Sequence, residues 1–254
     1  MKNSKNKEIK DFLQSYTTLM TEVKITLTKD EAAEREYIID RLNVHTNLKV
    51  DVAEFKKFVT ITVTAESETF FTIIKDIISS VILIFYKFRA LKEGITAIDS
   101  GNIVHYALLS AFMSFDQDQE ALFIEKGLEP NGSFAIKTIY EFRHPNLKES
   151  WNNIVSLANK LISQCATEEE IYELIFFLLA VEQDIAPKIR IETLNGKHKI
   201  FCDSIPIAIP RLTENENFNY IMATVRERPA SIVICEPSTM HKDLLSAIKK
   251  LGEN

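Results

Sequence analysis

The chain has 254 residues, of which 46% are hydrophobic and 26% are charged, which is the composition of an ordinary globular protein. The formal net charge is -6 and no basic stripe stands out, so we expect no nucleic-acid partner. The six glycines and seven prolines leave no long flexible linker. The polar, basic start KNSKNKEIK lacks the apolar core of a secretory signal peptide.

The cysteines bear on the compartment. Cys165, Cys202 and Cys235 are widely spaced and form no CxxC pair. An odd number of cysteines, without a signal peptide, is typical of reduced thiols in the cytoplasm. We therefore predict a cytoplasmic protein without a disulfide framework.

The first third of the chain reads as a small sheet. The β-branched residues alternate along Val23–Thr28, Leu48–Val52 and Phe58–Thr64, which predicts three strands. Between the first two, Asp30 is placed to cap a helix that runs to about Leu42.

Two long helices are predicted next, over Glu66–Leu91 and Ile103–Lys126, and Gly127 is a plausible C-cap for the second. The uncharged run Ile77–Tyr86 in the first helix has ten residues, about half of the roughly 20 that a membrane span needs. We therefore expect a core helix and no integral membrane segment. The alternative is that this run faces a membrane surface in a peripheral protein.

A break at Pro130–Gly132 divides the sequence into residues 1–128, in the order β-α-β-β-α-α, and residues 129–254. Ser133–Phe142, directly after the break, is ambiguous between strand and helix. Pro145 then begins a helix with a narrow apolar seam, which we expect to face the helix that follows. The seam consists of Leu147, Trp151, Ile154, Ala158, Leu161 and Cys165.

The stretch Thr167–Gln183 predicts the central helix of the second region. Thr167 and Glu170 have the spacing of a capping box. From Ile171 to Val181 only Glu173 is charged, so the helix is apolar on nearly all sides and is expected to be buried. The short connection to the preceding helix predicts an antiparallel helical hairpin at the centre of the second region.

The rest of the second region mixes strands and helices, in the overall order α-α-β-β-α-β-α. Asn195-Gly196 is a strong hairpin signal between two strand-like runs. The predicted fold class is therefore α+β, with small mixed or antiparallel sheets packed by helices. The predicted elements are strands Lys188–Thr193 and Lys199–Cys202, helix Glu214–Arg228, a central strand Ser231–Cys235 and helix Met240–Leu251.

Known catalytic and binding motifs are missing: the sequence contains no GxGxxG, P-loop, HExxH or GxSxG. The first weaker grouping is Glu141, Arg143 and His144 beside Pro145, where an acid, a base and an imidazole lie close together. These are weak catalytic candidates, and the alternative is a solvated turn with ion pairs.

The second grouping is a possible polar surface site where the central helix ends; a helix end that simply meets solvent explains it equally well. It comprises Glu182, Gln183, Asp184, Lys188 and Arg190.

The third grouping is His198 with Cys202. Residues four apart on a strand lie on the same face, so this pair could bind a metal or activate a thiolate. Two residues are too few for a metal site, and a buried, structural Cys202 is the alternative. We predict no cofactor and no metal.

The segment Ser133–Ile191 resembles the YtxC-like family of sporulation proteins. An aromatic and basic segment leads into a long helix, an acidic start opens a very apolar helix, and Gln and Pro-Lys precede a strand. The hairpin and the later helices fit as well. Members of that family tend to end with a cysteine cluster, whereas this sequence stops at Asn254 without one, so no metal or redox role carries over. The family has no established activity, and the resemblance implies only a setting, endospore formation.

We therefore expect a non-enzymatic cytoplasmic protein that acts by binding another protein. One alternative is an enzyme with an unfamiliar site, at Glu141, Arg143 and His144 or within Glu182–Arg190. The other is the peripheral membrane protein described above.

Overall fold

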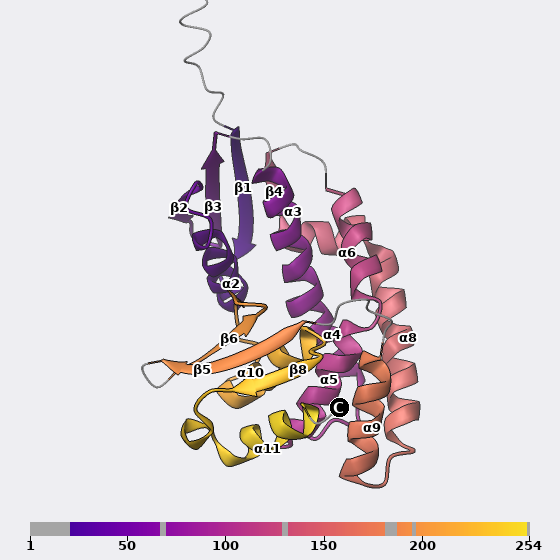
Figure 1. The fold of residues 1–254 in the computed structure, drawn as a ribbon. Coiled ribbons are helices and arrows are strands. Elements are labelled where there is room, and N and C mark those ends of the chain that lie inside the picture. The colour runs from indigo at the N-terminus through magenta and orange to yellow at the C-terminus, as the bar shows by residue number, and fades with distance from the viewer. Residues whose placement is uncertain (1–20, 67–69, 129–131, 181–186, 195–196, 253–254) are drawn as a thin grey trace, which may run out of the picture.

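The computed structural model describes residues 21–66, 70–128, 132–180, 187–194 and 197–252 (Figure 1). In these residues the strands form two four-stranded sheets, and helices pack beside them and between them. The predicted α+β class is confirmed. The predicted small mixed sheets are confirmed as well, because each sheet combines antiparallel pairs with one parallel pair.

Sheet A has the order β2-β3-β1-β4. It consists of β1 (Thr21–Thr28), β2 (Lys49–Glu54), β3 (Phe58–Ala65) and β4 (Ser133–Ala135). β1 is antiparallel to β3 and parallel to β4. Alternate residues of β1 and β3 are buried, as the β-branched pattern predicts for a sheet with one covered face.

Helix α2 (Ala32–Asn43) follows β1, and its start differs from the prediction. The residue at the N-cap is Glu31, and Asp30 does not cap the helix. The Glu31 carboxylate instead accepts hydrogen bonds from the amide of Thr28 at 2.7 Å and from its hydroxyl at 2.8 Å. Because Glu31 is buried and reaches Tyr86, it connects the strand end to the helical layer.

The long predicted helix is present as α3 (Phe70–Val81), a π-helical segment η1 (Ile82–Tyr86) and α4 (Lys87–Gly94). Except for the half-buried Ser80, the run Ile77–Tyr86 is buried. The prediction of a core helix is therefore confirmed, and the alternative of a membrane-facing run is wrong because neighbouring elements cover it. Across the described residues, every helix is too short or too polar to cross a membrane.

The single helix predicted over Ile103–Lys126 is wrong. It is two helices, α5 (Ile103–Ser114) and α6 (Gln117–Lys126), and the chain turns between them at Asp116 with a φ of 55°. Gly127 is the C-cap residue of α6, as predicted. α5 is buried almost throughout. Three later helices pack around it: α9 (Glu168–Leu179), α10 (Glu216–Arg226) and α11 (Lys242–Leu251).

The ambiguous segment after residue 132 forms β4, then α7 (Ile136–Thr138) and a second π-helical segment, η2 (Ile139–Arg143). Most of the predicted boundary at Pro130–Gly132 lies outside the described residues. The division at residue 128 stays a prediction. Contacts nevertheless span it, because β4 pairs with β1 in sheet A, and α4 and α5 pack against helices of the second region.

Helices α8 (Pro145–Ile162) and α9 (Glu168–Leu179) run in opposite directions across a short connection, as the predicted hairpin requires (Figure 1), but each packs mainly against a different helix. The apolar seam of α8 faces α4, and α9 packs against α5. The capping box at Thr167 and Glu170 is confirmed. Burial of α9 on all sides is wrong, because Phe177 is 74% exposed. The predicted end at Gln183 lies outside the described residues.

Sheet B has the order β7-β6-β5-β8. The predicted hairpin is confirmed, since Leu194 pairs with Lys197 across the two-residue turn. The last strand is at an edge of the sheet rather than at its centre, because it pairs with β5 on one side and meets α11 on the other. The elements are β5 (Lys188–Leu194), β6 (Lys197–Cys202), β7 (Ile205–Pro206), α10 (Glu216–Arg226), β8 (Ser231–Ile234), η3 (Pro237–Thr239) and α11 (Lys242–Leu251).

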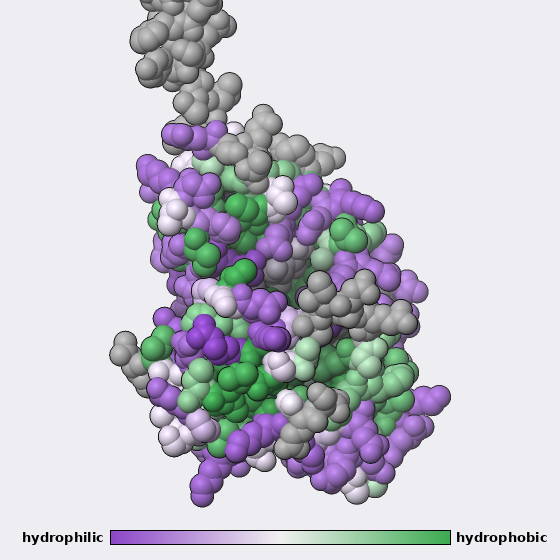
Figure 2. Space-filling model, viewed as in Figure 1, coloured by the Kyte–Doolittle hydropathy of each residue, from purple (hydrophilic) through white to green (hydrophobic). Residues whose placement is uncertain are grey.

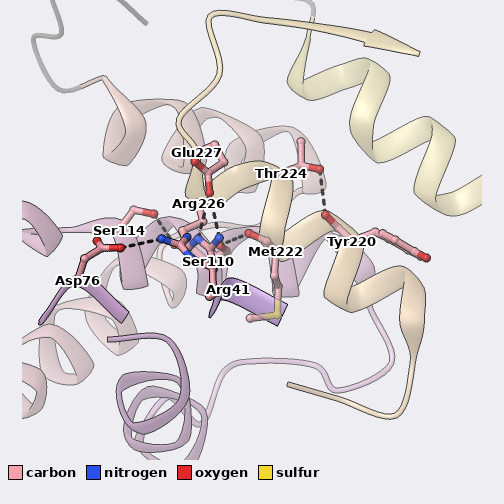
Figure 3. A network of polar contacts seen from close by, with 9 residues as sticks. All are labelled: Arg41, Asp76, Ser110, Ser114, Tyr220, Met222, Thr224, Arg226 and Glu227. Carbon is pink, nitrogen blue, oxygen red and sulfur yellow. Dashed lines mark hydrogen bonds and ion pairs between the residues drawn. The ribbon is translucent and has the colours of Figure 1, made fainter. Parts of the chain in front are cut away.

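Polar contacts fasten α5 to α10 inside the helical layer (Figure 3). The Ser110 hydroxyl on α5 donates to the Met222 carbonyl on α10 at 2.7 Å, and the Ser114 hydroxyl donates back to the Ser110 carbonyl at 3.1 Å. At the end of α10, Arg226 pairs with Glu227 at 2.9 Å. These contacts satisfy most of the buried polar groups named here, at a helix contact that joins the two predicted regions, whereas Arg226 Nη1 has no partner among the described residues.

Candidate functional site

The first predicted grouping lies where η2 passes the C-terminal end of α6. Glu141 and Arg143 are exposed, whereas His144 is only 2% exposed. The Arg143 Nη1 donates to the Gly127 carbonyl at 3.3 Å. Among the described residues, no hydrogen bond or ion pair joins the three predicted side chains. The structure therefore places them together in space without linking them as an acid–base unit.

His144 is a buried imidazole without hydrogen bonds, since neither ring nitrogen has a partner among the described residues. Its ring meets Phe123 edge-on, with centroids 5.1 Å apart. A Cβ at Gly127 would lie 2.6 Å from His144 Cε1, so only glycine fits there. Burial lowers the pKa of His144, and the nearby Arg143 charge adds to this. A neutral imidazole closed off from solvent is poorly placed to transfer a proton.

Exposed apolar side chains lie on both of the elements that meet at His144. Phe142 on η2 is 75% exposed, and Leu122 and Phe123 on α6 are 58% and 44% exposed. We call these three residues, with the flanking Glu141 and Arg143, the α6–η2 surface. Figure 2 shows an apolar area over α6, separate from the larger one over sheet B and its neighbouring helices. Sequence periodicity could not reveal this surface, because it identifies apolar residues without showing whether another element covers them.

Of the second predicted grouping, Glu182, Gln183 and Asp184 lie outside the described residues. Lys188 and Arg190 are on β5, and they point to the face of sheet B opposite the buried Ile189. Arg190 forms an ion pair with Glu192 and lies over the Phe201 ring, 4.6 Å from its centroid. The described part of this grouping is thus a sheet face on which Arg190 is paired, and the polar pocket mouth stays a prediction.

The third grouping, His198 and Cys202, lies on the face of β6 that turns toward α10. The His198 ring meets Tyr220 edge-on at 5.0 Å, and its Nδ1 is 3.1 Å from the Thr193 hydroxyl. Burial lowers the pKa of His198 and raises the pKa of the Cys202 thiol. An activated thiolate requires a lowered thiol pKa. In the described part of the chain, no three His, Cys, Asp or Glu residues are placed to hold a metal ion.

A cavity of about 510 Å³ lies where the N-terminal ends of α5, α9, α10 and α11 converge. The sequence did not predict it, although capping residues that line it mark three of these four starts, and Thr167 caps the fourth, that of α9. The Asn102 side chain accepts from the Val104 amide at 2.8 Å, and Asn215 accepts from the Asn217 amide at 3.0 Å. His241 is the third capping residue.

The charge around this cavity is balanced. Helix N-termini attract anions, but the acidic residues Asp99, Glu168 and Asp243 also line the cavity and offset that attraction. No lysine or arginine is among the described residues that line it. The cavity is therefore a polar recess without an assembled acid, base or nucleophile.

A buried ionic cluster joins α4, α6 and α8. Lys87 is fully buried, and its Nζ donates to Glu120 Oε2 at 2.6 Å and to the Phe115 carbonyl at 2.8 Å. Trp151 Nε1 donates to the second Glu120 oxygen at 2.9 Å. Burial lowers the pKa of Lys87 and raises the pKa of Glu120, while each group's charge opposes the shift of the other. Because every polar atom named here has a partner and solvent is excluded, we assign this cluster to the scaffold.

Comparison of the chain with family models, with curated proteins and with solved structures found no match. The resemblance to YtxC-like sporulation proteins thus stays a hypothesis that rests on the sequence features described above.

Proposed function

We propose that this chain is a non-enzymatic cytoplasmic protein that binds another protein through the α6–η2 surface, in the setting of endospore formation. The observation that supports it best is the exposure of Phe142, Leu122 and Phe123 on two elements that meet at His144. Exposed large apolar side chains with charged neighbours are typical of interaction sites.

The composition of the surface fits a protein partner. Aromatic residues and arginine dominate the binding energy of interfaces, and they do so when an apolar centre is surrounded by polar groups. Phe142 supplies the centre, and Arg143 and Glu141 supply charges of opposite sign at the rim. Full burial of one such aromatic side chain contributes about 1.5–3 kcal/mol. The partner segment would carry an apolar face with an acidic residue opposite Arg143.

The support for an enzyme is weaker. His144 has no hydrogen-bond partner among the described residues and is closed off from solvent, whereas Glu141 and Arg143 are exposed. The alternative of a peripheral membrane protein depended on Ile77–Tyr86, which is buried inside the helical layer.

The test is an affinity pull-down from sporulating and from vegetative cells with three baits: the unmodified chain, Phe142→Ser and Phe177→Ser. Phe177 is the matched control because it is the same residue type and is equally exposed, at 74%, on α9. We expect a specific partner from sporulating cells with the unmodified chain and with Phe177→Ser, and its loss with Phe142→Ser. Circular dichroism checks that all three are folded. Recovery of no specific partner at either stage, or equal recovery with Phe142→Ser, would contradict the proposal.

A further inference from the structure

Strand β2 is an open edge of sheet A. It pairs with β3 on one side, and among the described residues no strand lies on its other side. Its residues are exposed apart from the half-buried Val50. Proteins usually protect such an edge with proline, a bulge, charged side chains or a covering element, because its free amides and carbonyls pair readily with another strand. β2, KVDVAE, contains no proline, and its own protection is the charge of Lys49, Asp51 and Glu54, which a strand with the complementary charge order would not oppose.

The hairpin turn fixes which backbone groups face this edge. The Phe55 amide donates to the Phe58 carbonyl at 2.9 Å, so it points toward β3. Amide direction alternates along a strand, so the amides of Asp51 and Ala53 also point toward β3. Those of Val50 and Val52 point outward, away from the sheet. A second strand laid along β2 would meet these two.

The side chains of β2 are arranged differently on the two faces. Val50 and Val52 pair with the buried residues Val63 and Ile61, so they are on the covered face of the sheet, and Val52 is still 46% exposed. Lys49 and Asp51 are on the open face, with Lys49 Nζ 3.7 Å from Asp51 Oδ2. Over residues 49–52, each face of β2 therefore presents one kind of chemistry to a neighbouring strand, apolar on one side and alternating charge on the other.

We propose that β2 pairs with β2 of a second copy of this chain, antiparallel and with the two-fold axis at Val50. In this register Lys49 lies opposite the partner's Asp51, and the two-fold symmetry repeats the attraction. On the covered face, Val52 lies opposite the partner's Leu48. The contact is isologous, so it closes as a dimer. It is independent of the α6–η2 surface.

Charge selects this register over its neighbours. Opposed residues of antiparallel strands share a face, so the axis can move only in whole residue steps along β2. An axis at Asp51 would place the Asp51 side chains of the two copies directly opposite each other. An axis at Val52 would place the Glu54 carboxylate opposite Val50 on the apolar face. Only the axis at Val50 pairs opposite charges on one face and apolar side chains on the other.

The backbone groups fit the same register. The outward Val50 amide would donate to the partner's Val50 carbonyl, and the Val52 amide to the partner's Leu48 carbonyl. The Leu48 amide already donates to the His45 carbonyl at 3.1 Å, so Leu48 contributes only its carbonyl. These bonds would join the two copies of sheet A into one continuous sheet.

Analytical ultracentrifugation of the full chain at low salt, over a range of concentrations, tests the proposal. The unmodified chain is expected to show a reversible monomer–dimer equilibrium. Lys49→Asp alone and Asp51→Lys alone each place like charges opposite one another twice, which should weaken the dimer by about tenfold. The double reversal Lys49→Asp with Asp51→Lys restores opposite charges and should restore the dimer. Both residues are exposed, so their reversal leaves the fold intact.

A second variant, Val50→Pro, removes an outward amide without removing an amide from the β2–β3 ladder. It should leave a folded monomer. A chain that stays monomeric at every concentration would overturn the proposal. So would a dimer that is indifferent to both the charge reversals and Val50→Pro, because it would then form through another surface. Binding of a foreign extended peptide to a monomeric chain would likewise overturn the choice of a second copy.

Discussion

Two helical runs in this protein have nearly the same apolar composition and very different surroundings. The run Ile77–Tyr86 in α3 and η1 is enclosed, because α2 and α6 pack against it. Helix α9 packs mainly against α5, and Phe177 on its far side is 74% exposed. Apolar composition therefore indicates that a helix can be buried. The number of elements that pack on it decides how much of its circumference is covered.

The largest expected effect separates the two faces of α9. Leu178 is only 5% exposed, so Leu178→Asp would lose the apolar contacts of the leucine and bury an unpaired carboxylate. Loss of a buried leucine side chain costs about 2–5 kcal/mol before the charge is counted. Since α9 packs on the central helix α5, we expect the second region to unfold. Circular dichroism and urea unfolding of the purified variant would show this.

The neighbouring Phe177→Asp is the matched control for that experiment. It introduces the same charge one residue away, on the exposed side, where substitutions usually change stability by about 0.5 kcal/mol or less. Equal effects of the two substitutions would mean that α9 does not have one covered and one open face. A folded, soluble Leu178→Asp protein would contradict the burial of this face directly.

The next largest effect concerns Lys87, the residue that directly follows the enclosed run. Lys87 is tolerated there because Glu120 and the Phe115 carbonyl accept its hydrogen bonds. Lys87→Met would leave the Glu120 carboxylate buried and without its ion pair, at a cost of about 3–5 kcal/mol in the free energy of unfolding. Urea unfolding measures this cost.

The double variant Lys87→Met with Glu120→Gln is the control. It removes both charges and keeps an acceptor for Trp151 Nε1, so much of the lost stability should return. If Lys87→Met alone costs less than about 1 kcal/mol, the enclosed run is open to water at this end, and the contrast between the two runs is weaker than the structure indicates.

Local signals predicted the elements well. The alternation in β1 and β3, the capping box at Thr167 and the Asn195-Gly196 turn each act within a few residues, and the strands, the helix start and the hairpin follow from them. The break at Asp116 was missed because a non-glycine residue in a left-handed conformation leaves no composition signal.

Long-range pairings were not predictable in the same way. β4 is three residues long, too short for periodicity, and it pairs with β1 from more than a hundred residues away. Lys87 and Glu120 are 33 residues apart and read individually as surface charges. For the candidate site, sequence reasoning named Glu141, Arg143 and His144 but not Phe142 or Phe123, whose significance is their exposure. Exposure depends on which elements stop short of covering a residue, and no local pattern records that.

The smallest expected effect concerns His144, which packs against α6, one of the helices that enclose the run Ile77–Tyr86. Burial holds the pKa of His144 below its ordinary value of 6.5, so the folded state favours the neutral ring, whereas the unfolded chain takes up a proton as the pH falls through 6.5. His144 therefore contributes stability that is present above this pH and is lost as the pH falls toward its folded pKa. One pH unit below the unfolded pKa, this loss can reach at most about 1.4 kcal/mol.

His144→Phe removes the titration while it keeps an aromatic ring against Phe123. Carboxylates and His198 also titrate on acidification, so the informative quantity is the difference in unfolding free energy between the two proteins, measured by urea at pH about 7.5 and about 5.5. Any packing cost of the larger ring is independent of pH and cancels in that comparison. The unmodified chain should lose more stability than His144→Phe on acidification. Equal losses would mean that His144 reaches water when it is protonated, and that the contact between η2 and α6 opens to allow this.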